Sequence, residues 1–294
     1  MTDGRGRRDG AGTPLRELLR VRTGARHGGR VDLGAYASSA IPAGPTDKRA
    51  GQAAAAGLAG PLADLQERLY AASTAGDRRR LLLVLQGMDT SGKGGTVKHV
   101  IGLFNPSGCR ITAFKAPTPE EKEHPFLWRV GKAVPRPGEI GIFDRSHYED
   151  VLIARVRALA PPEVLERRYG EINAFEHSLA EEGVTVVKVL LHVGFEEQRE
   201  RLLRRLDRPD KHWKFDPADI EERRSWQAYQ EAYERVLERC STEAAPWYVV
   251  PADRKWYRNW AVSRLLLEHL EELDPRYPPA RFDVEACRAR LMDG

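Results

Sequence analysis

Five short apolar runs divide the sequence, and each is rich in leucine or β-branched residues with little alternation of polar and apolar positions. They lie at residues 81–86, 110–114, 139–144, 185–193 and 247–252. Runs of this kind are typical of strands that are covered on both faces, and the stretches between them carry helical periodicity. The pattern predicts an α/β fold with a five-stranded parallel sheet flanked by helices.

One long helix is expected at residues 216–239, shortly before the last strand. Its apolar side chains recur at spacings of three and four with charged residues between them: Trp226, Tyr229, Tyr233, Val236 and Leu237. Such a stripe is more typical of a helix face packed in the core than of a binding site. Prolines at positions 209 and 217 bracket the preceding segment, so residues 210–216 are expected to form a loop or a break between helices.

The composition fits a cytoplasmic protein with no membrane segment. Apolar residues make up 41% of the 294 positions, enough for a substantial core, and charged residues make up 31%. No stretch approaches the roughly 18 consecutive apolar residues of a membrane span, and the N-terminus lacks the apolar segment of a secretory signal. The three cysteines, Cys109, Cys240 and Cys287, stand singly, without the spacing of a zinc site.

Three regions are expected along the chain. Residues 1–31 are rich in arginine and glycine and are predicted to form a disordered tail. Residues 32–276 are assigned to the catalytic domain, with segment 35–60 wrapping around it, and residues 277–294 to a C-terminal tail. The net charge of +4 only weakly favours a polyanionic partner, because part of the excess lies in the N-terminal tail. A solvated tail is a better interpretation of those arginines than nucleic-acid binding.

A phosphate-binding loop is predicted directly after the first strand. Residues 87–96 read GMDTSGKGGT, which contains the GxxxxGK pattern, and a helical stretch follows. Backbone N–H groups and the positive end of that helix can cradle phosphate oxygens, and glycines permit the close approach. Lys93 is expected to bridge the terminal phosphates. The other phosphate-binding positions are assigned to Gly87, Gly92, Gly94, Gly95 and Thr96.

Two carboxylates predict a magnesium site. The Ser or Thr that usually follows the loop lysine is Gly94 here, so the hydroxyl that ordinarily ligates magnesium is missing. Asp89 lies inside the loop, where a carboxylate beside phosphates needs a cation between them. The third strand ends in Asp144, in the pattern of a Walker B carboxylate, and parallel strands bring their carboxyl ends to one edge of the sheet. Asp89 is therefore predicted to bind magnesium or to orient the attacking phosphate, and Asp144 to bind magnesium.

Further polar residues follow this strand. Arg145 is placed to neutralise charge on a transferring phosphoryl group. His147 suggests acid–base chemistry, but transfer onto a phosphate oxygen requires no proton removal at neutral pH, so a structural or substrate-positioning role is favoured. Glu149 and Asp150 are interpreted as supporting carboxylates or as residues at a helix N-terminus.

Residues 198–225 are interpreted as a lid. The segment 198–214 holds five arginines and two lysines against three acids. A charge run of this kind is usually a solvated helix face, but its position after the fourth strand favours an arginine-rich lid that closes over the substrate phosphates. Arg201 and Arg205 are four positions apart and share a helix face. A second basic cluster, residues 253–258, follows the fifth strand at the same edge.

Together these motifs resemble those of the family-2 polyphosphate kinases over residues 35–276. The stretches GMDTSGKGGT, FDRSHYEDVL, EEQRERLLRRLDRPDKHWKFDPAD and APWYVVPADRKWYRNW occur in that family's order. The resemblance implies a thymidylate-kinase-like P-loop core and dependence on Mg²⁺, with Mn²⁺ as an alternative ion. It also implies reversible phosphoryl transfer between inorganic polyphosphate and nucleoside mono- or diphosphates.

The resemblance also assigns residues to roles. The catalytic residues by matching motif are Asp89, Lys93, Asp144 and Arg145, with the two carboxylates as metal ligands. Arg201 and Arg205 match lid arginines, and Lys115, in the FKAPT stretch after the second strand, resembles a position near the phosphates. The RSHYEDVL form resembles members that accept both AMP and ADP. The expected partners are polyphosphate, nucleotides and further copies of the chain, as a dimer or tetramer.

Three alternatives remain open from the residues alone. An ATP-dependent nucleotide kinase of the thymidylate-kinase type would use the same loop, carboxylates and lid. A nucleotide-binding switch would use the loop without catalysis, but the sequence has no NKxD motif and its lid has more arginines than a switch needs. A polyphosphate- or nucleic-acid-binding protein without catalysis is the third. The sequence does not specify the preferred nucleotide, the direction of transfer or the chain length of polyphosphate.

Overall fold

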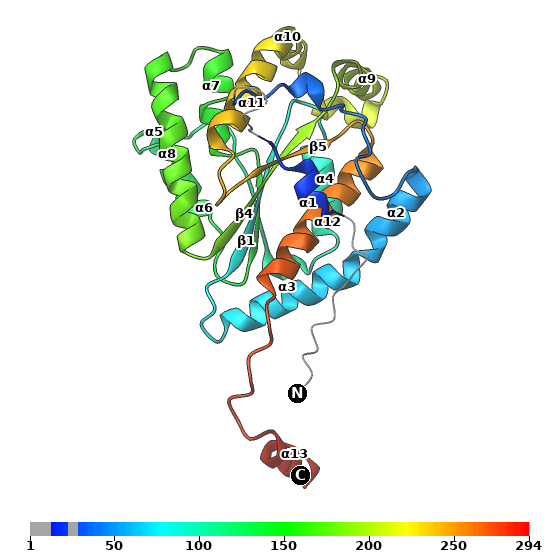
Figure 1. Cartoon of the computed structure of the whole chain (residues 1–294), viewed down its shortest axis with the longest axis vertical. Helices are drawn as coiled ribbons and strands as arrows, with labels where there is room; N and C mark the ends of the chain where they lie inside the picture. The colour runs from blue at the N-terminus through cyan, green and yellow to red at the C-terminus, as the bar shows by residue number, and fades with distance from the viewer. Residues whose placement is uncertain (1–12, 23–28, 294) are drawn as a thin grey trace.

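The five predicted strands form one sheet. The computed structural model describes residues 13–22 and 29–293. Its strands are β1 (Arg80–Gln86), β2 (Cys109–Ala113), β3 (Ile140–Asp144), β4 (Val184–His192) and β5 (Trp247–Pro251). Each predicted strand is therefore confirmed to within one residue at either end. The strands pair in the order β2-β3-β1-β4-β5, every pair is parallel, and the predicted α/β fold is confirmed (Figure 1).

Helices cover both faces of this sheet (Figure 1). The first face packs against three long helices: α3 (Ala59–Ser73), α4 (Lys93–Ile101) and α12 (Lys255–Leu273). The second face packs against α8 (Pro162–Glu181) and α11 (Trp226–Cys240). The central strand β1 is buried throughout because its apolar side chains alternate between these two cores. With both faces covered, access to the sheet is left at the carboxyl ends of the strands, where ligands bind in open α/β folds.

Shorter elements connect these layers. The remaining α-helices are α1 (Leu15–Leu19), α2 (Lys48–Gly57), α5 (Pro119–Lys122), α6 (Trp128–Ala133), α7 (Ile153–Val156), α9 (Phe195–Leu206), α10 (Ala218–Arg224) and α13 (Val284–Met292). The 3₁₀ helices are η2 (Leu33–Ala35), η3 (Pro106–Gly108), η4 (His147–Asp150) and η5 (Pro209–Lys214). No helix within the described ranges is long and apolar enough to cross a bilayer.

The helix expected at residues 216–239 is two helices. α10 ends at Arg224 and α11 begins at Trp226, with Ser225 between them. The two halves differ in their surroundings: α10 has no buried residue, whereas α11 carries the whole apolar stripe on its core face. The segment 210–216, expected as a loop or a break, is mostly the 3₁₀ helix η5. Packing therefore holds α11, while α10 belongs to the exposed lid.

The N-terminal segment differs from the predicted disordered tail wherever the structure describes it. Leu15 and Leu19 of α1 are buried against the first core, and Glu268 of α12 accepts hydrogen bonds from the backbone N–H groups of Leu15 (3.1 Å) and Arg16 (2.9 Å). The chain then runs along the outer edge of β5, where the Val21 N–H donates to the Trp247 carbonyl oxygen at 2.9 Å. The rest of the predicted tail, residues 1–12 and 23–28, lies outside the described residues.

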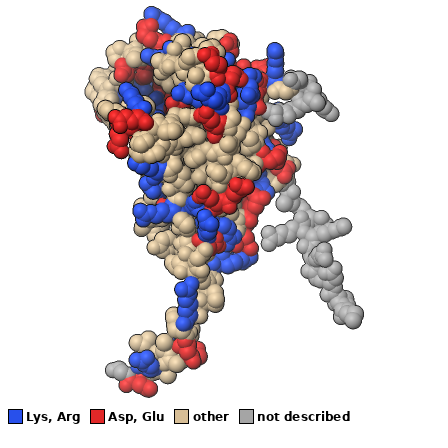
Figure 2. All heavy atoms as spheres, turned by 90° about the vertical axis from the view of Figure 1, so that its left-hand side faces the viewer, with Lys and Arg blue, Asp and Glu red and all other residues tan. Residues whose placement is uncertain are grey.

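The two segments that flank the catalytic core behave differently. In the stretch 35–60, expected to wrap the domain, Asp47 caps α2 by accepting from the Ala50 N–H at 2.9 Å, and α2 packs against α12. At the other end, the chain leaves α12 at Asp274 and ends in α13, which hangs clear of the body in two views (Figures 1 and 2).

Candidate active site

The phosphate loop joins β1 to α4 and depends on two glycines. Gly87 has a φ of 151° and Gly92 a φ of 106°, which side chains rarely adopt. A Cβ atom at Gly87 would lie 2.7 Å from the Leu191 carbonyl oxygen, and one at Gly92 would lie 1.7 Å from Nη1 of Arg258. A Cβ atom at Gly94, in contrast, would meet nothing within 4 Å. The loop is thus packed tightly against Leu191 and Arg258 at Gly87 and Gly92, and it is open at Gly94.

The first turn of α4 is available to an anion. The helix begins at Lys93, and its N-cap residue Gly92 offers no side-chain cap. The first N–H groups of a helix have no partner within it, so they can donate to phosphate oxygens. Gly94 and Gly95 are both exposed there, whereas Thr96 is buried, and its hydroxyl has no hydrogen-bond partner among the described residues. The predicted positions Gly94 and Gly95 therefore lie where an anion can approach the backbone.

Lys93 turns back over the loop. Its Nζ donates to the Gly87 carbonyl oxygen at 2.6 Å and lies 3.4 Å from that of Met88. Burial lowers the pKa of Lys93, and the nearby Arg145 lowers it further, although Asp89, Glu149 and Asp144 act in the opposite direction. A phosphate brought to this amine would favour its charged form. The same interactions place the lysine among the two predicted carboxylates and the predicted arginine.

Strand β3 delivers Asp144 and Arg145 to this loop. The register of the sheet pairs Asp144 with Leu85, two residues before the loop begins. Arg145 donates from Nη2 to Oδ1 of Asp89 at 3.0 Å. Although burial opposes its charge, Glu149 and Asp89 hold the pKa of Arg145 above its ordinary value. The four predicted catalytic residues, Asp89, Lys93, Asp144 and Arg145, are therefore close together at one edge of the sheet.

The backbone of Arg145 is itself unusual. Its φ of 65° lies in the left-handed region, which costs a non-glycine residue about 1 kcal/mol or more. Its N–H nevertheless donates to the Leu85 carbonyl oxygen at 3.1 Å, which continues the pairing of β3 with β1 by one bond. The surrounding sheet thus holds Arg145 in this conformation and aims its side chain at the loop.

Glu149 is a third carboxylate of the site that was interpreted from the sequence only as a supporting residue. Burial raises its pKa, against the influence of Arg145 and Lys93. With the Gln86 amide oriented to satisfy both of its atoms, its nitrogen donates to Oε1 of Glu149 at 3.1 Å and its oxygen accepts from the Ser146 hydroxyl at 3.2 Å. Since Gln86 is fully buried at the end of β1, Glu149 is anchored to the sheet directly behind the loop.

His147 belongs to a buried polar cluster and not to the open site. Its Nε2 lies 3.2 Å from Oε1 of Glu176, and the Tyr148 hydroxyl donates to the same oxygen at 2.8 Å. Lys188, from the middle of β4, donates to Oε2 of Glu176 at 2.5 Å and to the Cys240 carbonyl oxygen at 2.6 Å. All of these side chains are buried, which supports the structural role favoured for His147. We call this set the Glu176 cluster.

Asp150 is also turned away from the phosphate loop. Arg168 donates to its backbone carbonyl at 2.8 Å, and the guanidinium groups of Arg129 and Arg168 each lie 3.9 Å from its carboxylate. Burial raises the pKa of Asp150, while the two arginines oppose that rise. Asp150 thus connects η4 to α6 and α8 through these two arginines, which stabilises the segment that follows β3.

Arg201 does not lie where a lid arginine that contacts phosphate would be expected. It is 6% exposed and donates to four backbone carbonyl oxygens: Thr90 at 2.8 Å, Ser91 at 3.1 Å, Ala252 at 2.6 Å and Asp253 at 2.9 Å. Its Nε donates to Glu197 at 2.7 Å. The guanidinium is therefore fully engaged in joining the phosphate loop to the segment after β5. Its predicted role as a phosphate contact stays a prediction, and the contacts in this structure support a role in fixing the loop.

Arg258 supports the loop from the second basic cluster. Its Nη1 donates to the Ser91 carbonyl oxygen at 3.2 Å, and the guanidinium fills the space below Gly92. Burial lowers the pKa of Arg258 to about 10, and the charge of Arg201 adds to that effect. Two buried arginines thus hold the same carbonyl group. The positive charges of these two arginines lie directly beneath the loop. The sequence motif alone does not reveal this arrangement.

The lid consists of α9, η5 and α10, at the top of Figure 1. Gln198 connects it to the loop by donating to the Asp89 carbonyl oxygen at 3.1 Å. Arg205 donates to the Lys214 carbonyl oxygen at 2.9 Å and lies 3.4 Å from the carboxylate of Asp219. Burial raises the pKa of Asp219, and Asp89 is its next largest influence, which indicates that this part of the lid faces the loop. A role for Arg205 as a phosphate contact stays a prediction.

Lys115 is exposed after the end of β2, two strands away from β1 along the same edge. Its backbone carbonyl oxygen accepts from Nη1 of Arg129 at 2.9 Å, which holds the segment in place. A role for its side chain near the phosphates stays a prediction.

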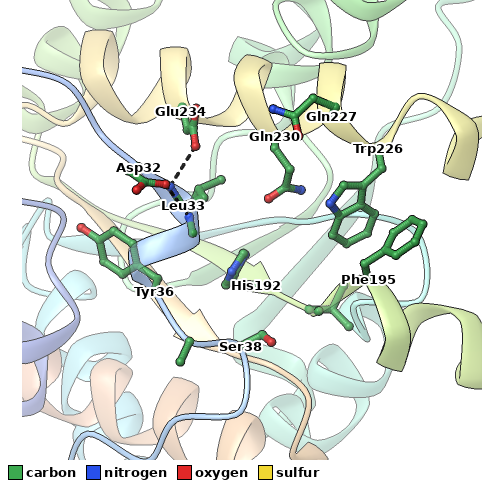
Figure 3. A pocket seen from close by; sticks show the side chains of 14 residues that line it. Asp32, Leu33, Tyr36, Ser38, His192, Phe195, Trp226, Gln227, Gln230 and Glu234 are labelled. Atoms are coloured by element: carbon green, nitrogen blue, oxygen red, sulfur yellow. Dashed lines mark hydrogen bonds between the residues drawn. The ribbon is translucent and has the colours of Figure 1, made fainter.

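A cavity of about 400 Å³ lies beside the lid, between residues 32–38, the end of β4 and the start of α11 (Figure 3). Phe195 and Trp226 meet edge to face on one side of it, with ring centres 5.1 Å apart, and Tyr36 lies on the other. Asp32 and Glu234 contribute carboxylates, while the lining contains neither lysine nor arginine. This lining does not suit a polyanion, so the loop stays the candidate site for phosphate.

The two predicted metal ligands suit a magnesium ion that retains water. No group of three or more His, Cys, Asp or Glu side chains among the described residues is arranged to hold a metal. Mg²⁺ commonly binds through one or two carboxylates together with waters and substrate phosphates. Asp89 is 33% exposed and uses Oδ1 for Arg145, which leaves Oδ2 available. Asp89 and Asp144 therefore fit an ion that is completed by the substrate and not by the protein alone.

Comparison with known proteins agrees with this geometry. The family model "Polyphosphate kinase 2" matches residues 45–278. An AMP/ADP-polyphosphate phosphotransferase from Meiothermus ruber is 48% identical over 85% of this chain and 92% of its own length. An ADP-polyphosphate phosphotransferase from Rhodopseudomonas palustris is 39% identical, over 75% of this chain and 80% of its own.

The fold comparison gives the same result. The crystal structure of polyphosphate kinase 2 from Arthrobacter aurescens TC1 matches with a TM-score of 0.92 and 48% identity, over 96% of this chain and 98% of that one. The match confirms the P-loop kinase fold that the resemblance implied. The chain belongs to the polyphosphate kinase 2 family.

Proposed function

We propose that this enzyme transfers a phosphoryl group between inorganic polyphosphate and adenine nucleotides, with AMP and ADP as acceptors. The observation that carries the proposal is the meeting of Asp89, Lys93, Asp144 and Arg145 around the open side of the phosphate loop. The names of the relatives from Meiothermus ruber and Rhodopseudomonas palustris support polyphosphate and adenine nucleotides as the substrates.

The reaction requires charge neutralisation more than proton transfer. A terminal phosphate oxygen of the nucleotide forms a new P–O bond to the end phosphorus of polyphosphate, and the P–O bond to the shortened chain breaks. Both the attacking and the leaving oxygens are anionic at neutral pH, so no side chain has to remove a proton. The N–H groups at the start of α4 and the Nζ of Lys93 bind the phosphate oxygens, and Arg145 offsets charge on the transferred group.

Asp89 and Asp144 would hold Mg²⁺ or Mn²⁺ against the substrate phosphates. The bound ion supplies electrostatic stabilisation of the phosphate oxygens. Asp89 has a second task in this scheme, because its contact with Arg145 keeps the arginine near the loop before substrate arrives. Arg201 acts as a positioning residue that fixes the loop, and Arg205 and Lys115 are the candidates for further phosphate contacts from the lid and from β2.

The direct test supplies polyphosphate and ADP, or polyphosphate and AMP, to purified enzyme with no ATP present. Formation of ATP or ADP supports the proposal, and Lys93→Ala is the matched inactive control. GMP and GDP run in parallel report the base preference. If product forms from AMP only when ATP is supplied, the enzyme is an ATP-dependent nucleotide kinase of the thymidylate-kinase type. Nucleotide binding without turnover on any donor would instead indicate a binding protein.

The metal requirement has its own test. Enzyme stripped with a chelator should lose transfer and recover it with Mg²⁺ or Mn²⁺, and calorimetry should show that Asp144→Asn weakens binding of the metal–nucleotide complex. Full activity after removal of divalent ions would contradict the assignment.

We also propose a cytoplasmic location and a homo-oligomeric assembly. The three cysteines are unpaired, which fits a reducing compartment in which adenine nucleotides are available. Fractionation of the source cells and measurement of the mass of the protein in solution test these two points.

A further inference from the structure

The cavity beside the lid has two chemically different ends (Figure 3). The carboxylates of Asp32 and Glu234 lie at one end, and the rings of Phe195 and Trp226 lie at the other. Gln230 of α11 extends into the space between them. The volume of about 400 Å³ falls within the range of sites that hold small molecules, roughly 300–1,000 Å³. The cavity is therefore large enough for a molecule with a charge at one end and an apolar body at the other.

The acidic end of the cavity can accept hydrogen bonds from a cation. Oδ1 of Asp32 accepts from the Gly34 N–H at 2.8 Å, and Oε1 of Glu234 accepts from the Leu33 N–H at 2.9 Å. The second oxygen of each carboxylate makes no hydrogen bond to the described residues. Burial raises the pKa of Glu234, and the neighbouring carboxylate of Asp32 raises it further, although the Leu33 N–H acts in the opposite direction. A bound cation would relieve this repulsion between the two acids.

Among the described residues, no cation in the lining balances these two acids. The lining holds neither lysine nor arginine, and burial holds the pKa of its histidine, His192, below the ordinary value of 6.5, so the ring is neutral at pH 7. A primary ammonium group, with three N–H donors, matches the free carboxylate oxygens. A metal ion fits less well, because no group of three His, Cys, Asp or Glu side chains in the described part of the chain is arranged to hold one.

The aromatic end favours an apolar body over a second charge. The Phe195 and Trp226 rings meet edge to face with their centres 5.1 Å apart. The guanidinium carbon of Arg223 already lies over the Phe195 ring, 3.4 Å from its centre, and its charge would repel another cation there. An aromatic or aliphatic group can instead pack against the two rings. The occupant that fits both ends is therefore a monoamine with an apolar body, and not a diamine.

The two ends of the lid meet at this cavity. The lid begins at Phe195, the first residue of α9, and the chain leaves it at Trp226, the first residue of α11, so both ends lie in the cavity wall. Arg223 of α10 donates to the Phe195 carbonyl oxygen at 2.6 Å and to Oε1 of Gln198 at 2.9 Å. Gln198 in turn donates to the carbonyl oxygen of Asp89 in the phosphate loop at 3.1 Å. An occupant of the cavity would therefore contact side chains that are connected to the loop through the base of the lid.

We propose that this cavity is a second ligand site, separate from the phosphate loop, that binds a small primary amine with an apolar body. The ammonium group pairs with Asp32 and Glu234, and the apolar body packs on Phe195 and Trp226. The occupant bridges residues 32–38 and both ends of the lid, so binding favours the lid arrangement described here over one in which these ends separate. The proposal does not depend on which phosphate donor or nucleotide the enzyme uses.

The test titrates matched small molecules into the full-length enzyme without nucleotide or polyphosphate. Phenethylamine carries both features, phenethyl alcohol has the same shape without the charge, and methylamine has the charge without the apolar body. Calorimetry should show that phenethylamine binds at least ~10-fold more tightly than either of the other two. Equal affinity for the amine and the alcohol, or no binding of the amine at ~10 mM, would overturn the proposal.

Two variants of α11 locate the site. Glu234→Gln removes a carboxylate of the lining, whereas Glu231→Gln removes one that lies three positions earlier and outside the lining. We expect the first to weaken binding of phenethylamine by at least ~10-fold and the second by less than ~3-fold. Equal effects would show that binding depends on charge at a distance and not on contact with Glu234, and the assigned site would be wrong.

The indole N–H resonance of Trp226 reports binding to the wild-type protein, so this readout does not require a variant to fold as wild type does. Trp226→Phe identifies the resonance by its loss. Phenethylamine should shift this resonance and leave that of Trp213, which is 78% exposed on the lid, in place. A shift at Trp213 alone would place the amine elsewhere and overturn the proposal. Hydrogen exchange of the α10 amides should slow when the amine is bound, and unchanged exchange at saturation would refute the connection to the lid.

Discussion

Arg145 donates from Nη2 to Oδ1 of Asp89 at 3.0 Å, so the arginine after the Walker B strand and the carboxylate inside the phosphate loop neutralise each other. Both side chains remain partly exposed, 41% for Arg145 and 33% for Asp89, and are accessible to substrate. An arriving phosphate can therefore compete with Asp89 for the arginine, and the carboxylate is then available to a cation. Under the proposed function, this exchange would couple binding of the anion to binding of its metal.

Replacing Asp89 with asparagine should remove this coupling with little change in shape. We expect kcat/KM for ATP formation from polyphosphate and ADP to fall by at least ~100-fold, because the charge that positions Arg145, and that is proposed to hold the metal, is lost. Thermal unfolding should shift little, since Asp89 is partly exposed. Asp64→Asn, which removes only the surface pair with Arg68, is the control. Activity near wild type in Asp89→Asn would refute the role of this carboxylate.

Gly92→Ala should disrupt the loop. The new methyl group would need to enter the space of the Arg258 guanidinium, and the residue would keep a φ of 106° that alanine rarely adopts. We expect a loss of ~2–4 kcal/mol in the free energy of unfolding, together with loss of activity. Denaturant titration measures the first effect. Gly94→Ala, which meets no atom within 4 Å, should leave the unfolding midpoint unchanged, and an equal loss in both variants would contradict the steric argument.

The two lid arginines should respond differently to substitution. Arg201 bonds to four backbone carbonyl groups, and lysine cannot reproduce that fork of donors, so Arg201→Lys should lower both the unfolding temperature and turnover. Arg205→Ala should lower turnover by ~10-fold or more and leave the unfolding temperature nearly constant, because Arg205 is held only at the lid surface. Parallel melting curves and steady-state rates separate the two effects. The distinction fails if both variants lose activity with no change in stability.

The Glu176 cluster should control stability. Glu176→Gln leaves the ammonium group of Lys188 buried without a counter-charge, and we expect a loss of ~3–5 kcal/mol at pH 7. Urea unfolding measures this loss. The exposed Glu171→Gln on the same helix should cost less than ~0.5 kcal/mol. The double variant Glu176→Leu with Lys188→Met should recover much of the loss, and failure to recover would indicate that hydrogen bonds to Tyr148 and His147 matter more than charge.

The same cluster predicts the direction of a pH effect. Burial alone would raise the pKa of Glu176, but Lys188 and His147 outweigh burial and hold it below the ordinary value of 4.5. A carboxylate whose pKa is depressed in the folded state adds stability above its unfolded pKa and loses it as the pH falls through the folded pKa. The stability difference between wild type and Glu176→Gln should therefore be full above pH 4.5 and shrink in more acidic solution. A difference that grows as the pH falls would contradict this sign.

Local patterns in the sequence were sufficient for the sheet and for bringing three candidate residues to one edge of it. Each strand is a buried apolar run, and Asp89, Lys93 and Asp144 follow from a loop motif and from the rule that parallel strands share one carboxyl edge. Arg201 could not be placed in this way, because its four partners lie up to 111 positions away and are backbone atoms that no sequence pattern specifies. The hydrogen bond that anchors Glu149 could not be predicted either, because it depends on the buried Gln86.

The N-terminal region shows why composition can mislead. Its arginines and glycines suggested disorder throughout, yet Leu15 and Leu19 are spaced for one helix face and find a buried site on α12. A five-residue helix gives too weak a periodic signal to be recognised among charged residues. The break between α10 and α11 was missed for a related reason, since residues on both sides of Ser225 favour helix and only tertiary packing separates the two.

The backbone of residues 20–21 occupies the free side of β5, where Val21 bonds to Trp247 and Arg20 pairs with Tyr248 in an antiparallel bridge. An unpaired strand edge readily recruits strands from other molecules. A shortened protein that begins after residue 22 would display this edge, and its yield in soluble form should suffer from aggregation while its catalytic groups are all still present. Residues 20–21 thus protect the edge of the sheet, and affinity tags are better attached ahead of this segment than in its place.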